Sequence, residues 1–232
     1  TTGDLSGALK SYMNGFHTVV PWSRNDRIRL LDFTAANTEL SDEILKNNEL
    51  FSEYINLKLS EAGCRYGIGG YNEHRTIYSR SPLFSEEEGE EPRRLHLGTD
   101  IWGPAGTPVY APLDGEVHST GFHDSFGNYG AVIVLEHQLE GITFHTIYGH
   151  LSKASVDSKS IGQRIEKGEL IAAFGPPEEN GHWPPHLHFQ LIQDMEGNKG
   201  DYPGVCKLSE RDKYLSNCPD PDLILNMMKY AI

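Results

Sequence analysis

Between residues 94 and 193 the chain is divided into short apolar segments by closely spaced turns. Turn residues (Gly, Pro, Asn or Asp) recur at 103–106, 114–115, 127–128, 140–141, 167–168 and 175–177. Short apolar runs bounded in this way are typical of β-strands. Strands are predicted over residues 95–101, 108–111, 115–120, 131–137, 142–148, 170–174 and 186–193. No long helix is predicted in this part, so the sequence indicates a mainly β core.

The N-terminal portion, residues 1–63, has a different pattern and is predicted to be mostly helical. Apolar residues at Leu5, Leu9 and Met13 favour a short helix over residues 4–14. A longer helix is predicted to run to residue 61, with Thr38 or Ser41 as its N-cap and Gly63 as its stop. Glycine-dense strand and turn material follows from residue 65. The acidic stretch 85–91 is predicted to be a solvated connector before the core.

Charge and cysteine content limit the classes of function. The net charge of −13 argues against nucleic-acid binding and against unaided adhesion to an anionic membrane. No apolar run is long enough to predict a membrane segment. The three cysteines form no Cys-x-x-Cys pair. A bridge between Cys206 and Cys218 is expected only in an oxidising compartment, and free thiols in a reducing compartment are favoured by about two to one. The N-terminus lacks signal-peptide features, so the location is left open with a preference for the cytoplasm.

Three histidine-bearing segments and one carboxylate lie in the predicted β core: His96 with Asp100, His150, and His186 with His188. A hydrolytic zinc site needs three protein ligands and one open position for water, and two histidines with one aspartate meet this need. Alternate residues of a strand share a face, which predicts that His186 and His188 project to the same side. The same argument predicts one face for Tyr148 and His150. Histidines that do not bind metal can act as general base or stabilise an oxyanion.

The order and spacing of these segments carry a family resemblance. The matching stretches are His-Leu-Gly-Thr-Asp at 96–100, Gly-Thr-Pro-Val-Tyr-Ala-Pro-Leu-Asp-Gly-Glu-Val at 106–117, 127–137, Tyr-Gly-His-Leu at 148–151, 162–175, and His-Leu-His-Phe at 186–189. In this combination the chain resembles the lysostaphin-like, or LytM-type, zinc metallopeptidases, which cut peptide cross-links in peptidoglycan.

The resemblance implies specific roles for five residues. The zinc ligands would be His96, Asp100 and His188. The catalytic pair would be His150 and His186, without an indication of which is the general base. The resemblance also implies a small antiparallel β-barrel or sandwich with a groove. Zn²⁺ is the expected cofactor.

The chain departs from the family pattern before His186, where residues 176–185 are rich in proline and include Trp183. This segment is expected to reshape the groove wall. Gln190 stands where the family often has Glu, with little expected consequence. Trp102 is predicted to be a core residue. The remaining histidines of the core are expected at the surface or in packing: His118, His123, His137, His145 and His182.

Four parts are predicted: a helical N-terminal extension (1–63), a strand and loop segment bordering the groove (64–92), the zinc metallopeptidase β core (93–195), and an irregular C-terminal tail with a short helix (196–232). In the second part, the Tyr66 to Arg80 segment, which contains Asn72-Glu73-His74-Arg75, is expected to supply substrate contacts or to occlude the zinc. A polar hairpin without a site role is the alternative.

The function predicted from the sequence is zinc-dependent endopeptidase activity on a peptide or peptidoglycan fragment. One alternative is a binding or regulatory module that holds zinc without turnover. Another is a zinc hydrolase of a small amidated metabolite. The scissile bond and the oligomeric state are not indicated by the sequence.

Overall fold

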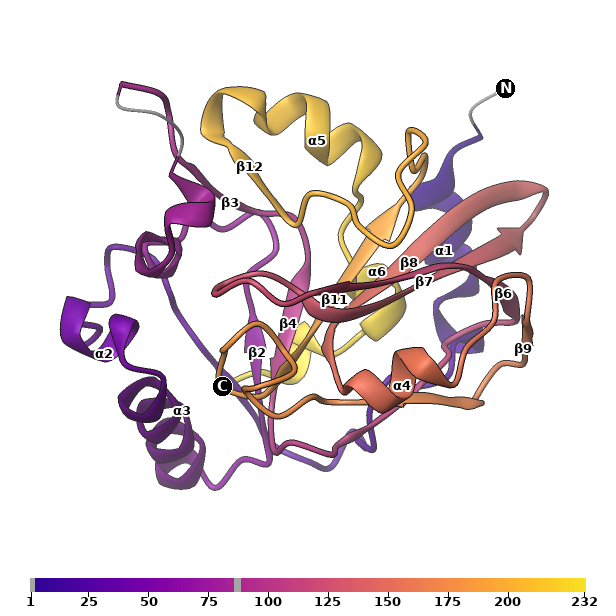
Figure 1. The fold of residues 1–232 in the computed structure, drawn as a ribbon. Helices are drawn as coiled ribbons and strands as arrows, with labels where there is room; N and C mark the ends of the chain where they lie inside the picture. The colour runs from indigo at the N-terminus through magenta and orange to yellow at the C-terminus, as the bar shows by residue number, and fades with distance from the viewer. Residues whose placement is uncertain (1–2, 86–88) are drawn as a thin grey trace.

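The structure is a computed structural model that describes residues 3–85 and 89–232. Its centre is an eight-stranded sheet (Figure 1). In spatial order the strands are β1 (Ile28–Leu30), β2 (Tyr66–Gly69), β4 (Thr99–Trp102), β11 (His186–Ile192), β8 (Ile142–Leu151), β7 (Gly130–Leu139), β6 (Gly115–His123) and β9 (Arg164–Ile165). Two smaller pairs accompany it: β5 (Pro108–Tyr110) with β10 (Leu170–Ala173), and β3 (Arg93–His96) with β12 (Val205–Lys207).

The large sheet is mixed. All its neighbouring strands are antiparallel except β1 and β2, which pair in parallel. The prediction of a mainly β fold is confirmed, whereas a wholly antiparallel sheet is not found. The strand order runs from β1 to β9 without closing among the described residues. The barrel or sandwich therefore stays a prediction.

Both faces of the sheet are covered, which explains the continuous apolar run in β7. Ala131, Ile133 and Leu135 belong to one core cluster, while Val132 and Val134 belong to another on the opposite face. The first cluster also takes in residues of α1 (Leu5–Tyr12) and α6 (Asp222–Leu225). Figure 1 shows α5 (Arg211–Asn217) and β12 on the other side of the sheet. Helices α1 and α6, near the two ends of the chain, thus pack on the same face of the sheet, opposite α5 and β12.

The N-terminal helices follow the predicted caps but not the predicted continuity. Asp4 accepts a hydrogen bond from the Gly7 amide and begins α1, which continues as a 3₁₀ turn η1 (Met13–Gly15). The long helix is two helices, α2 (Asp42–Lys46) and α3 (Asn48–Ala62). Asn47 separates them because it has extended backbone angles and caps the α3 amides with its side chain. Ser41 caps α2, and Gly63 ends α3 in the left-handed conformation, as predicted.

The segment before the core contains less strand than predicted. β2 is present, but the stretch after His74 forms the 3₁₀ helices η2 (Ile77–Arg80) and η3 (Pro82–Phe84). Ile77 and Tyr78 are buried in a cluster with Trp102 and Trp183, and this packing overrides their β propensity. Residues 86–88 of the acidic connector lie outside the described residues.

Within the core, the predicted strand 95–101 is two strands in different sheets, β3 and β4. Gly98 lies between them, and a Cβ there would approach the His188 ring at 2.6 Å. The close approach of the two histidine-bearing segments thus requires a glycine at this break. α4 (Lys153–Asp157) is only five residues long, in agreement with the absence of a long helix.

The C-terminal tail has more regular structure than predicted. Besides α6 it contains β12, the 3₁₀ helices η4 (Leu208–Glu210) and η5 (Met228–Tyr230), and α5. All three cysteines are free thiols, and both Cys206 and Cys218 are buried. Within residues 3–85 and 89–232 there is no helix with the length and apolar character needed to cross a membrane.

Candidate metal centre and active site

His96, Asp100 and His188 come together in the interior although they belong to β3, β4 and β11. His188 lies directly opposite Asp100 in the pairing of β11 with β4, so both side chains lie on one face of the sheet. His96 Nε2 lies 3.0 Å from His188 Nδ1, and each nitrogen lies 3.3 Å from Asp100 Oδ1. Three donor atoms thus form a nearly equilateral triangle.

Each of the three side chains is held through its other polar atom. His96 Nδ1 donates to the Gly70 carbonyl at 3.0 Å, so Nε2 carries the lone pair. His188 Nε2 donates to Gln190 Oε1 at 2.7 Å, which leaves Nδ1 as the donor atom. Asp100 Oδ2 accepts from the guanidinium of Arg75. Partners of this kind orient metal ligands and fix their tautomers.

The triangle fits a zinc ion. Donors about 2.0 Å from a tetrahedral zinc lie about 3.3 Å from each other. Asp100 Oδ1 is buried and has no hydrogen-bond partner among the described residues. A bound cation would supply the partner that a buried carboxylate oxygen needs. Burial by itself would raise the pKa of Asp100, but His96 and Arg75 hold it well below the usual value. Burial lowers the pKa of His96 to about 3, which keeps this ring neutral.

Arg75 links the metal centre to the segment between Tyr66 and Arg80. Its side chain is fully buried, donates to Glu73 Oε1 at 2.9 Å and to the Gly69 carbonyl at 3.3 Å, and lies over the Phe33 ring at 5.2 Å. Together with Gly70, which accepts from His96, Arg75 places this segment against two of the three candidate metal ligands. These contacts favour a site role for the segment over a polar hairpin without one. Substrate contacts and occlusion stay predictions.

His150 and His186 lie beside the triangle, with ring centroids 4.1 Å apart. His186 Nδ1 donates to the Pro184 carbonyl, and His150 Nδ1 donates to the Asn180 carbonyl, each at 2.8 Å. The described part of the chain offers no hydrogen bond to Nε2 of either ring, so both present a lone pair. Burial lowers the pKa of His186 to about 4, and burial with the neighbouring His186 lowers the pKa of His150 well below its usual value.

The backbone of His150 departs from the strand pattern. Strand alternation predicts that Tyr148 and His150 share a face, but Tyr148 packs in the core against Phe189, and His150 turns to the opposite face. The cause is a φ of +62° at His150, in the left-handed region. Such conformations are uncommon outside glycine and gather at functional sites. The register of β7 against β8 also shifts beside His150, and together these two features turn the ring toward His186.

The proline-rich segment 176–185 positions both rings, because it supplies the two accepting carbonyls. Asn180 fixes the segment: its buried amide donates to the Gly175 and Trp183 carbonyls, and its Oδ1 accepts from the Trp183 amide. The expectation that this segment reshapes the groove wall was incomplete, since it also holds the histidines.

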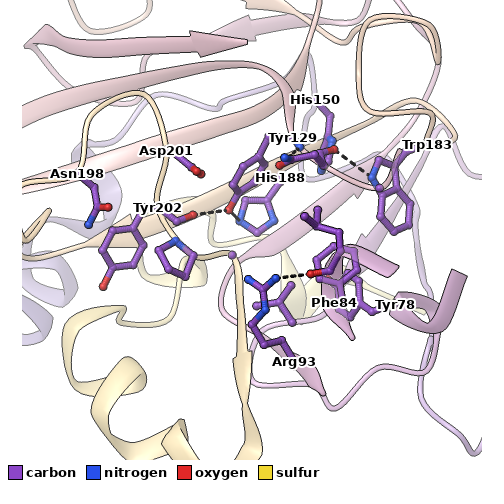
Figure 2. Close-up of a pocket in the computed structure, with 16 residues that line it drawn as sticks. Tyr78, Phe84, Arg93, Tyr129, His150, Trp183, His188, Asn198, Asp201 and Tyr202 are labelled. Atoms are coloured by element: carbon purple, nitrogen blue, oxygen red, sulfur yellow. Dashed lines mark hydrogen bonds between the residues drawn. The ribbon is translucent and has the colours of Figure 1, made fainter. Parts of the chain in front are cut away.

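A pocket of about 250 Å³ opens beside the metal centre (Figure 2). Figure 2 shows Tyr129 next to His188, with Trp183 on one side and Asp201 on the other. The Tyr129 hydroxyl donates to the Tyr202 carbonyl at 3.1 Å and lies 3.4 Å from His188 Nε2. The pocket is therefore continuous with a ligand of the triangle and with His150, which also lines it.

Several site residues were missed by the sequence reasoning. Trp102 is buried as predicted, but it also stacks on His186. Gln190 was given little weight, yet it orients His188. Arg75 was named only as part of a cluster. The contacts of Trp102 and Arg75 depend on strand pairing or on residues far along the chain, which the sequence pattern does not show. Gln190 lies two residues from His188 on β11, so strand alternation could have indicated its contact.

The other histidines are dispersed. His137 is buried between the Asp114 carbonyl and Thr146 Oγ1, a packing role. His123 contacts the Gly200 carbonyl, and His182 stacks on Phe126. His118 and His145 lie together beside Glu136.

Comparison with known proteins gives a family match in the same part of the chain. Residues 94–201 match the model of peptidase family M23. The chain is 35% identical over 150 residues to the peptidoglycan DD-endopeptidase ShyA of Vibrio cholerae, covering 60% of this chain and 32% of that protein. It is 31% identical over 151 residues to the L-Ala–D-Glu endopeptidase of Bacillus subtilis, covering 63% and 42%. The chain thus spans less than half the length of either relative.

Among solved structures, a zinc-containing peptidase from Vibrio cholerae is 31% identical and covers 53% of this chain and 32% of that chain, with a TM-score of 0.38. The catalytic domain of lysostaphin from Staphylococcus simulans is 20% identical and covers 70% and 96%, with a TM-score of 0.40. These scores are too low for an argument from shape.

The preference for a cytoplasmic location is not supported, because the curated relatives include one named for peptidoglycan.

Proposed function

We propose that this chain is a zinc-dependent endopeptidase that hydrolyses a peptide bond of peptidoglycan, because residues 94–201 match the model of peptidase family M23. One observation carries the proposal: two imidazoles with open Nε2 atoms lie beside a His, Asp, His triangle at the wall of a pocket. The name of one curated relative, a peptidoglycan DD-endopeptidase, supports peptidoglycan as the substrate class.

His96, Asp100 and His188 would hold the ion. When bound, zinc supplies a Lewis acid that acidifies water and polarises the scissile carbonyl. The remaining steps belong to the protein. A neutral imidazole, at His150 or His186, accepts the proton of the attacking water through Nε2 and delivers it to the departing amine. The other ring stabilises the oxyanion once its Nε2 is protonated, because its Nδ1–H is already donated to a backbone carbonyl.

The pocket and the fixed tautomers support these separate roles for His150 and His186. Since both Nδ1 atoms donate to backbone carbonyls, neither ring can rotate without losing a buried hydrogen bond. The peptide would enter along Tyr129 and Trp183, which line the pocket with His150. We also propose the four-part division of the chain and the barrel or sandwich form of its core. With peptidoglycan as the substrate, the protein acts in a compartment where peptidoglycan is accessible.

The test is cleavage of purified peptidoglycan fragments by the zinc-loaded protein, with products identified by mass spectrometry. Cross-linked dimers should yield monomers if the cross-link is cut, and monomers should yield shortened stems if the bond lies within a stem. His150→Ala and His186→Ala should each lower turnover by about 10²–10⁴-fold while retaining the active-site zinc.

His17→Ala is the control, because His17 is exposed and does not line the pocket beside the candidate metal centre. It should cleave at the wild-type rate. Zinc-loaded wild type that binds fragments without releasing product would refute the proposal in favour of a binding module. Hydrolysis of small amides without cleavage of any fragment would refute the substrate class.

A further inference from the structure

Three potential metal ligands lie on neighbouring strands away from the active site: His118 on β6, Glu136 on β7 and His145 on β8. One ligand atom from each lies within 4.8 Å of those of the other two. Glu136 pairs directly with His145 across β7 and β8, which places both side chains on one face. The group is therefore assembled by regular strand pairing.

A β-bulge brings the third member into place. The register of β6 against β7 shifts between Val117 and Ser119, so His118 is the extra residue. Bulges redirect a side chain out of the regular alternation and gather near functional sites. Here the His118 ring approaches the His145 ring edge to face, with centroids 5.0 Å apart.

This group is distinct from the metal centre described above. In the pairing of β8 with β11, His188 lies opposite Gly149, whereas His145 lies opposite Ile192. Four residues of strand correspond to roughly 13 Å. A single ion cannot contact both groups.

The hydrogen bonds of the two histidine rings leave ring nitrogens available to bind a metal ion. His118 Nδ1 lies 2.8 Å from Ser119 Oγ, which also accepts from the Gly200 amide at 2.8 Å. If Nδ1–H donates to this oxygen, Nε2 carries the lone pair. His145 is 6% exposed, its Nε2 lies 3.3 Å from Glu136 Oε2, and its Nδ1 has no partner within the described residues.

An ion pair of His145 with Glu136 explains only part of this arrangement. It leaves the imidazole of His118 beside the pair without a role, and two protonated rings this close would repel each other. Burial, followed by the charge of His145, lowers the pKa of His118, which favours the neutral form. A divalent cation would engage all three side chains at once.

We propose that His118, Glu136 and His145 bind a second divalent transition-metal ion. Two imidazoles and one carboxylate are a donor set that suits Zn²⁺ and neighbouring metals such as Ni²⁺. The Glu136 side chain is 33% exposed, so water can reach the group and complete the coordination. The bound ion would join β6, β7 and β8 and stabilise the fold there.

The experiment is equilibrium dialysis of the full chain against Zn²⁺, followed by metal analysis. The wild type should bind two ions, His96→Ala one, His118→Ala one, and the double variant none. His118 and Glu136 are both partly exposed, so His118→Ala and Glu136→Gln should fold even if His96→Ala does not. A wild type with one ion that His118→Ala retains would overturn the proposal.

His123→Ala is the matched control, since His123 lies on the same strand and contacts the Gly200 carbonyl. It should keep both ions, and loss of an ion from this variant would count against the assignment. Zinc should also raise the melting temperature of the wild type more than that of His118→Ala. None of these measurements uses peptide cleavage, so their outcome tests the second metal site independently of the proposed function.

Discussion

The indole of Trp102 stacks on the imidazole of His186, with ring centroids 3.8 Å apart and planes inclined by 17°. The two residues face each other across β4 and β11, and both are buried. The stack covers one face of His186, while Pro184 fixes its Nδ1. The position of the ring is therefore set by an aromatic surface together with one hydrogen bond.

Trp102→Ala should remove that surface and leave a cavity. Loss of a buried tryptophan typically costs about 3–5 kcal/mol of folding free energy. Displacement of His186 should lower kcat on the order of 10–100-fold, with the active-site zinc retained. Trp102→Phe keeps an aromatic face and should recover most of the rate. Equal rates for the Phe and Ala variants, measured on folded protein, would contradict the positioning role.

Arg75→Ala should weaken zinc binding at the active site by about 10–100-fold, as expected for loss of a partner that orients a metal ligand. Arg75 fixes Asp100 Oδ2, and the variant would leave this carboxylate free to rotate. Competition with a chromophoric chelator measures the affinity. Arg75→Lys should restore it only partly, because an ammonium lacks the planar fork that reaches Asp100 and Glu73 together. His74→Ala, the exposed neighbour, should bind zinc normally.

Asn180→Ala should separate catalysis from metal binding. The variant leaves buried backbone groups of Gly175 and Trp183 without partners, at about 1–3 kcal/mol for each group. The segment that holds His150 should then loosen, and kcat should fall while zinc affinity is unchanged. Glu178→Ala changes an exposed side chain in the same segment and serves as control. A fall in zinc affinity that parallels the fall in kcat would rule out this separation.

Metal removal should lower the thermal stability of the wild type. A ligand at 100 times its Kd contributes about 2.7 kcal/mol, which corresponds to roughly 5–10 °C in the melting temperature of a chain of this size. Dialysis against a chelator and then against zinc should lower and restore the melting temperature in calorimetry. The His96→Ala, His118→Ala double variant should show no such change. A zinc-induced shift in that variant would point to binding elsewhere.

Much of the core was predictable because its strands are short, apolar and bounded by turn residues, as in β7 and β8. The five candidate site residues were selected from their types and order, and the structure brings them together. The break at Asn47 was missed because its side chain competes with the helix for backbone amides. The split between β3 and β4 was missed because the apolar pattern continues through Gly98. Arg75 was undervalued because its partner Asp100 lies 25 residues further along the chain. Gln190 was undervalued although it lies two residues from His188 on β11, where strand alternation places both side chains on one face.

The two imidazoles of the proposed active site are held by one short piece of backbone, through the carbonyls of Asn180 and Pro184. Any displacement of that piece turns both rings in the same movement. His150 and His186 therefore form a mechanically coupled pair. A peptide that pushes against Trp183, which belongs to the same piece and lines the pocket, would adjust both proton acceptors at once.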